Sequence, residues 1–298
     1  MGENEESIFE TLRGLGIDDI PNHAALERIG YLIDLSGDLR REEGTARALE
    51  WCDLLEGHNL SNEEAILLEY FQANAWGNRE RQAHAQRSAA WAWEQPELQK
   101  QILHLRRAIN HKGFDQFDEI RRCQIYTNLG NSLSTIGRFV EALEYWDRAL
   151  ALRPNFGMAL GNRGCGLAKY ATTLYDSSHQ RVFCLFAHKN LSAALSDEAF
   201  YNDPGYESAR SCFRQKRDWI DSVVDVEEIS RNIKYTGCGL DTSDEERRYR
   251  QWCLQNRLFL NPLNDLGPYA IGGRDTLQLP SFVTPLDEPP ISLDFSIR

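Results

Sequence analysis

Three pairs of arginine and histidine are the residues of this sequence whose types and spacing could act on a phosphate. A histidine can serve as general acid or base, and an arginine can hold a phosphate oxygen. The pairs are Arg79/His84, Arg106/His111 and Arg181/His188. With 7 histidines in the chain, chance alone supplies about two such pairs. The pairs by themselves therefore predict no catalytic site, and we interpret them as exposed residues of regular helices.

Other signatures of catalysis are missing from the sequence. It contains no GxxxxGK[ST] phosphate loop, no GxGxxG after a strand, no GxSxG and no HExxH. The 7 cysteines form no CxxC pair, and no histidine lies at the spacing of a metal ligand. We therefore expect reduced thiols, no metal, no cofactor and no catalytic residue, which favours a protein that is not an enzyme.

The composition is that of an ordinary globular protein with an acidic surface. The 298 residues include 33 Lys and Arg and 45 Asp and Glu, which gives a net charge of −12. An acidic chain disfavours nucleic-acid binding through overall electrostatics and favours a protein partner. No apolar stretch is long enough to cross a membrane, and the acidic start does not resemble a signal peptide. We predict a cytoplasmic protein without a membrane segment.

The elements that must position any site come from an internal repeat. From 123 to 156 the chain reads CQIYTNLGNSLSTIGRFVEALEYWDRALALRPNF. With Cys123 as position 1, the signature positions 4, 7, 8, 11, 20, 24, 27 and 32 are occupied by Tyr126, Leu129, Gly130, Leu133, Ala142, Trp146, Ala149 and Pro154. This spacing predicts two antiparallel helices that approach closely at Gly130, and the segment resembles a tetratricopeptide (TPR) repeat. Because one hairpin cannot bury both faces, neighbours are required.

Further hairpins are predicted on both sides of this repeat. One period later, Leu160, Gly164 and Leu167 repeat positions 4, 8 and 11, but Ala187, Leu191 and Ala194 come 11 residues late. The excess around 170–180 indicates a longer loop or lengthened helices. Upstream, 98–110 has the second-helix pattern with a first helix at 62–76. A weaker unit combines Leu26, Ile29, Gly30 and Ile33 with a turn at Gly37 and a helix at 46–55.

The expected fold is an all-α TPR-like solenoid of helical hairpins with an irregular, extended C-terminal tail. We divide it into divergent repeats at 1–120, core repeats at 121–197, additional helices at 198–258 and a tail rich in Pro and Gly at 259–298. The additional helices are predicted at 208–219, 225–234 and 243–257.

The binding face expected for such a fold is the concave side, formed by the first helices of the hairpins. The TPR resemblance implies that domains which clamp a carboxylate carry Lys at position 5, Asn at position 9 and Asn at position 6 of the next repeat. Here Asn131 and Asn162 fill the two Asn positions, Asn128 lies beside them, and Lys169 follows at position 13. Position 5 is Thr127, so the clamp lysine is missing. The predicted binding residues are Asn128, Asn131, Asn162 and Lys169, and the amides of the three asparagines suit a peptide backbone.

A second resemblance opens an alternative function. Residues 247–266 and 277–280 resemble the stretch that joins TPR repeats to a C-terminal HEPN domain in a family of bacterial proteins. That resemblance implies RNA cleavage in conflict systems, through an Arg-x4–6-His motif. The chain would then be an RNA-cleaving protein, or its regulatory subunit, with the effector core missing or truncated. The arginines at 247, 248, 250 and 257, interleaved with Tyr249 and Trp252, could contact RNA. A scaffold or adaptor that binds a peptide or protein is the first hypothesis.

Overall fold

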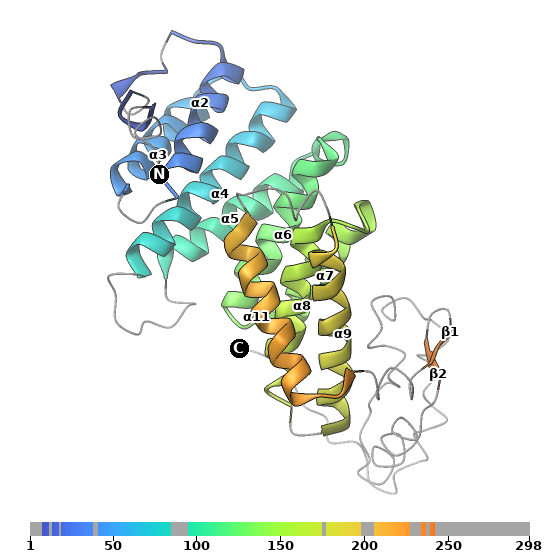
Figure 1. Ribbon diagram of the computed structural model, residues 1–298. Helices are drawn as coiled ribbons and strands as arrows, with labels where there is room; N and C mark the ends of the chain where they lie inside the picture. The colour runs from blue at the N-terminus through green and yellow to red at the C-terminus, as the bar shows by residue number, and fades with distance from the viewer. Residues whose placement is uncertain are drawn as a thin grey trace, which may run out of the picture.

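The chain folds into a curved stack of antiparallel helices. The computed structural model describes residues 8–11, 14–17, 19–37, 41–84, 95–174, 177–197, 206–226, 234–236 and 239–241. Within these ranges four helical hairpins follow one another along the chain, and a further helix packs on the last of them (Figure 1). The predicted all-α solenoid of TPR-like hairpins is confirmed for this part of the chain.

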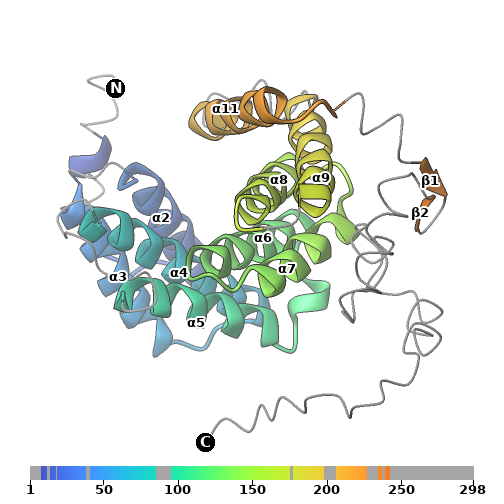
Figure 2. The ribbon, with the colours of Figure 1, turned by 90° about the horizontal axis from the view of Figure 1, so that it is seen from below.

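The hairpins pair consecutive helices. Their bounds are α2 (Asn22–Leu35) with α3 (Glu42–Glu56), α4 (Asn62–His84) with α5 (Pro96–Asn110), α6 (Glu119–Thr135) with α7 (Phe139–Leu152), and α8 (Gly157–Ala171) with α9 (Ser177–Leu195). A short 3-10 helix, η2 (Phe114–Gln116), precedes α6, and α11 (Glu207–Val223) packs against α8 and α9. Figure 2 shows the first helices of the hairpins on the inner side of the curve and α3, α5 and α7 on the outer side.

Local sequence signals set where these helices begin and end. At the start of α4, the Ser61 backbone N–H donates to Glu64 Oε2 at 2.8 Å and the Glu64 N–H donates to Ser61 Oγ at 3.2 Å, a reciprocal capping box. Pro96 occupies the first turn of α5, where its missing N–H costs nothing. Gly137 has a φ of +84°, which a residue with a Cβ adopts only with strain, and this permits the tight turn from α6 into α7.

Glycines at the repeat positions let the paired helices touch. A Cβ on Gly130 would lie 2.6 Å from Trp146 Nε1, and a Cβ on Gly164 would lie 2.8 Å from Leu191 Cγ. Real side chains do not approach that closely, so each glycine makes room for the bulky residue of its partner helix. The contact between Gly164 and Leu191 also confirms that Leu191 occupies the repeat position of Trp146, although it comes later than expected in the sequence.

The late arrival of Leu191 results mainly from a longer second helix. The helix α9 has 19 residues, whereas α7 has 14. Helix α8 ends at Ala171 and α9 begins at Ser177, whereas α6 ends at Thr135 and α7 begins at Phe139. Of the two explanations left open by the sequence, lengthened helices therefore account for most of the excess.

Buried apolar side chains form two large clusters. One runs from the N-terminal helices to Trp146, and the other joins α8, α9 and α11 around Leu191 and Phe213. Phe139 and Leu143 of α7 pack against both clusters. The core is therefore continuous along the stack, as expected for repeats that bury their faces against neighbours.

One sequence prediction beyond α11 is wrong. The helix expected at 208–219 is present, but the helix expected at 225–234 is wrong at its end, because Lys234–Thr236 forms strand β1. This strand pairs antiparallel with β2 (Gly239–Asp241), with Tyr235 opposite Leu240. The physical reason is local, since Tyr235 and Thr236 favour strands and the Gly237-Cys238-Gly239 sequence favours a hairpin. The helix predicted at 243–257 and the tail at 259–298 lie outside the described residues.

Candidate concave binding groove

A polar groove of about 500 Å³ lies on the concave side of the stack. The groove takes side chains from the first helices of three successive hairpins, from α5 and from the residue that precedes α11. The lining residues that matter below are Asp34 of α2, Tyr70, Asn74, Glu80 and Arg81 of α4, Gln101 of α5, Asn128, Asn131 and Thr135 of α6, and Tyr206. Amide and hydroxyl groups dominate this set, so the groove offers both donors and acceptors.

The centre of the groove is an amide pair contributed by neighbouring hairpins. Asn128 Nδ2 of α6 donates to Asn74 Oδ1 of α4 at 3.1 Å. This hydrogen bond fixes the orientation of both amide groups. It leaves one amide hydrogen on Asn128, a second lone pair on Asn74 Oδ1 and the amide hydrogens of Asn74, all in fixed directions. Two amides held in this way can bond to the N–H and C=O groups of an extended peptide.

A second polar contact beside this pair ties the same two helices together. Tyr70 Oη donates to Gln124 Oε1 at 3.4 Å, and the Arg121 guanidinium donates to the same oxygen at 3.0 Å. The Arg121 guanidinium also lies 5.7 Å from the Tyr70 ring centroid. Burial raises the pKa of Tyr70, so its hydroxyl stays protonated and serves as a donor.

Charges in the groove nearly balance. Asp34 and Glu80 bring negative charge, and Arg81 brings positive charge. Desolvation raises the pKa of Asp34, and the nearby Arg121 acts in the opposite direction. The groove therefore carries no strong field of one sign, which suits a peptide backbone better than a highly charged segment.

Of the four predicted binding residues, Asn128 and Asn131 line the groove. Asn131 also has a structural role, because its Oδ1 accepts a hydrogen bond from Trp146 Nε1 at 3.0 Å. Thr127, at the position where a clamp would carry lysine, is buried and donates from Oγ1 to the Cys123 carbonyl oxygen at 2.7 Å. The helix itself therefore uses this side chain, and it does not face a ligand.

The other two predicted residues, Asn162 and Lys169, do not line this groove. In this hairpin, helix α11 packs on α8, where a Cβ on Gly161 would lie 1.9 Å from the Phe213 ring. The Nδ2 atom of Asn162 is buried and has no hydrogen-bond partner, while Lys169 is exposed in the last turn of α8. The binding role predicted for these two residues stays untested.

Sequence reasoning missed Asn74, the partner of Asn128. It lies inside the first helix predicted at 62–76, but its register relative to the later repeats was not assigned. A signal was available, because Asn74 and Asn78 are one helical turn apart and therefore share a face. Both residues line the groove.

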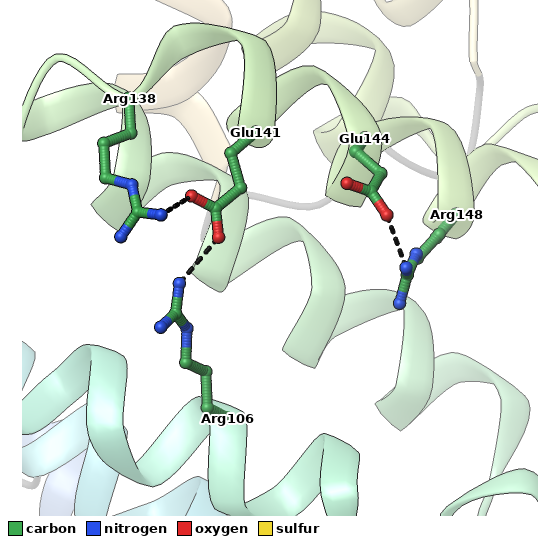
Figure 3. A network of polar contacts seen from close by, with 5 residues as sticks. All are labelled: Arg106, Arg138, Glu141, Glu144 and Arg148. Carbon is green, nitrogen blue, oxygen red and sulfur yellow. Dashed lines mark hydrogen bonds and ion pairs between the residues drawn. The ribbon is translucent and has the colours of Figure 1, made fainter. Parts of the chain in front are cut away.

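The arginine and histidine pairs do not assemble a phosphate site where the structure describes both members. Arg106 of α5 points to Glu141 of α7, with 2.6 Å between the ion-pairing atoms, and Glu141 also pairs with Arg138 (Figure 3). His111 Nδ1 instead accepts from the Gly113 N–H at 3.2 Å.

The Arg181/His188 pair is similarly dispersed. His188 Nε2 lies 3.2 Å from Asp221 Oδ1 of α11, so this histidine joins α9 to the last helix. Arg79 is exposed on α4, and the side chain of His84 is outside the description. His188 lies within α9, as interpreted from the sequence, whereas His111 directly follows the last residue of α5 and is outside the helix.

Several other expectations concern features that the structure describes only in part. Among the described residues, no group of three or more His, Cys, Asp and Glu side chains could hold a metal ion. No helix in the described ranges has the length and apolar character to cross a bilayer. The basic cluster Arg247, Arg248, Arg250 and Arg257 lies outside these ranges, as does the whole HEPN-like segment at 247–266.

Comparison with known proteins supports the repeat assignment. Residues 123–156 match the tetratricopeptide repeat family. No curated protein and no solved structure shows significant similarity to the chain. The chain therefore contains a tetratricopeptide repeat at α6–α7, and this repeat, within a stack of similar hairpins, supports a protein-interaction scaffold.

Proposed function

We propose that the protein is an adaptor that holds an extended peptide, or an extended segment of a partner protein, in the concave groove between α2, α4 and α6. The observation that carries the proposal is the Asn74–Asn128 pair, whose amides come from two hairpins and line the groove together. An amide offers one acceptor and two donors, which matches the alternating groups of a peptide backbone.

The size and charge of the groove support the same function. A groove of about 500 Å³ accommodates a few residues of an extended chain rather than a folded domain. Its near balance of charge leaves backbone recognition as the main source of affinity. The remaining acidic surface, with a net charge of −12 for the whole chain, keeps the scaffold soluble and disfavours nucleic acid as the ligand.

The test is a selection of peptides on the whole chain. A phage-displayed library of random 12-residue peptides is selected on the immobilised wild-type protein, and the binders are remeasured with Asn74→Ala/Asn128→Ala. We expect affinity to fall by about tenfold or more, because each lost backbone hydrogen bond is worth about 1 kcal/mol. Circular dichroism verifies that the variant remains folded.

A matched control removes two exposed amides outside the groove, in Asn110→Ala/Gln116→Ala. Selected peptides should bind this control as tightly as they bind the wild type. The proposal fails if no peptide is enriched over an empty support. It also fails if the enriched peptides bind the groove variant and the control equally well.

A further inference from the structure

A second cavity, of about 510 Å³, lies where α7 turns into α8, and we call it the corner pocket. Its lining includes four apolar residues of this turn, Leu152, Pro154, Phe156 and Met158. Pro154 is exposed, and the other three are half-buried. These side chains therefore keep apolar surface in contact with water, which a ligand can bury.

Tyr206 joins the corner pocket to the concave groove, because it lines both cavities. The helix α6 also borders both, since its first residue, Glu119, lines the corner pocket and Asn128 lines the groove. A ligand chain that leaves the Asn74–Asn128 pair toward the N-terminal end of α6 therefore passes Tyr206 and reaches the corner pocket.

The helical rise of α6 sets how much of the ligand lies between the two cavities. Glu119 and Asn128 are nine positions apart in the sequence. At about 1.5 Å per residue this separation is about 14 Å along the helix axis. An extended peptide advances by about 3.3–3.6 Å per residue. About four peptide residues therefore connect the amide pair to the corner pocket.

Charged residues of the corner pocket indicate which kind of side chain it accepts. Two carboxylates, from Glu119 and Asp197, and one guanidinium, from Arg153, line it beside the apolar residues. Arg153 Nε lies 3.9 Å from Glu119 Oε1, so the positive charge is already partly offset. An acidic ligand side chain would meet repulsion, and any charged side chain would lose hydration against the apolar lining. A large apolar side chain suits this pocket best.

We propose that the corner pocket holds a bulky aliphatic or aromatic side chain of the same extended ligand whose backbone binds the Asn74–Asn128 pair. This inference rests on the proposed function and adds the chemical class of the ligand. The ligand is an extended segment with a large apolar residue about four positions from the backbone groups held by the amides. Burial of this residue supplies affinity, and the directional hydrogen bonds of the amides fix the register of the ligand.

The experiment uses the full chain and the tightest 12-residue peptide selected on it. Each peptide residue is replaced in turn by alanine, each backbone N–H is replaced in turn by an N-methyl group, and fluorescence anisotropy measures the affinity. We expect one bulky apolar residue whose replacement by alanine weakens binding about tenfold or more. The N-methyl groups that weaken binding to the wild type but not to Asn74→Ala/Asn128→Ala should lie about four residues from it.

Met158→Glu tests the corner pocket from the side of the protein. The change puts a carboxylate into the apolar lining, and α8 should stay folded because glutamate is favourable in the first turn of a helix. The peptide should bind this variant about tenfold more weakly, and its alanine-substituted form should lose little further affinity. The matched control is Val140→Glu, since Val140 is the second residue of α7, as Met158 is of α8, but is exposed and lines neither cavity. This control should bind like the wild type.

The outcomes distinguish this inference from the proposed function. A peptide that needs Asn74 and Asn128 but binds Met158→Glu as tightly as Val140→Glu, and tolerates alanine at every apolar position, excludes the corner pocket and leaves the proposed function standing. A peptide that depends on Met158 but not on the two asparagines overturns the proposed function and the shared ligand together. The alanine scan uses the wild-type protein, so poor folding of a variant cannot obscure the result.

Discussion

The α6–α7 and α8–α9 hairpins place glycine at the same repeat position but surround it differently. In α6–α7, Gly130 makes room for Trp146, whose indole N–H then bonds to Asn131 at the edge of the groove. In α8–α9, Gly164 makes room for Leu191, which has no donor. The position equivalent to Asn131 is Cys165, which is half-buried and does not line the groove.

The two hairpins also differ in how they fill position 7. Leu129 of α6 is fully buried among apolar side chains, whereas the equivalent Arg163 of α8 is buried as an ion. Arg163 Nε donates to Asp147 Oδ1 of α7 at 2.8 Å. Position 7 is therefore apolar in α6, which lines the groove, and forms a buried ion pair in α8, which is covered by α11.

The largest expected effect on stability comes from removing the bulky side chain that packs against each glycine. We expect Trp146→Ala to lower the free energy of unfolding by about 4 kcal/mol and Leu191→Ala by about 3 kcal/mol. Both changes leave cavities, and Trp146→Ala also leaves Asn131 without its donor. Urea denaturation of both variants measures the difference. Equal losses would mean that the indole adds nothing beyond the aliphatic side chain.

The next largest effect on stability is expected from breaking the buried ion pair between Arg163 and Asp147. Arg163→Leu copies the apolar residue of α6 but leaves Asp147 without its cation, which we expect to cost about 3 kcal/mol. The double variant Arg163→Leu/Asp147→Leu should recover most of that loss, because neither charge remains buried. A double-mutant cycle in urea tests the coupling. Losses that simply add would show that the pair does not act as a unit.

Replacing asparagines should affect stability differently in α6 and in α8. Asn131→Ala removes the acceptor for the Trp146 indole, and we expect a loss of about 1–2 kcal/mol. Asn162→Ala removes an amide whose Nδ2 has no partner, so stability should change by less than about 0.5 kcal/mol. Thermal unfolding of both variants compares them. A larger loss for Asn162→Ala would show that this amide does have a partner in solution.

The smallest expected effect is the pH dependence contributed by Asp147. Desolvation raises the pKa of Asp147 above 3.8, and Arg163 only partly offsets this rise. The folded state thus binds the Asp147 proton more tightly than the unfolded state. Its stabilising contribution is present below pH 3.8 and is lost as the pH rises through the folded-state pKa.

Asp147→Asn should remove this contribution. Relative to the variant, the wild type should lose stability as the pH increases across that window, as measured by urea denaturation at successive pH values. The opposite slope would mean that Arg163 outweighs the desolvation of Asp147.

Much of the fold follows from residues whose roles are local. Gly130, Trp146 and Pro154 specify a hairpin because their sizes and dihedral preferences act within one pair of helices. The same pattern locates Gly164 and its partner Leu191 despite the longer α9. Beyond α11 the helical pattern was weak, and the strand at Lys234–Thr236 was missed because short strands depend on pairing with a partner segment.

The candidate site was predictable only in part. Repeat position alone identified Asn128 and Asn131 as groove residues, because helices with regular registers present the same positions to the concave side. It did not identify Asn74, whose helix has an irregular register, and it predicted a binding role for Asn162, which occupies the same repeat position as Asn128. In the structure Asn131 lines the groove and Asn162 does not.

The sequence by itself determined the repeating hairpins, the direction of their apolar faces and the amides of α6, because each depends on spacing within about 34 residues. The tertiary structure decided which amides meet across hairpins and which helix covers α8. These contacts join residues about 50 positions apart in the sequence, and their relative placement depends on loop lengths and on the sum of many packing contacts. No local pattern encodes that sum.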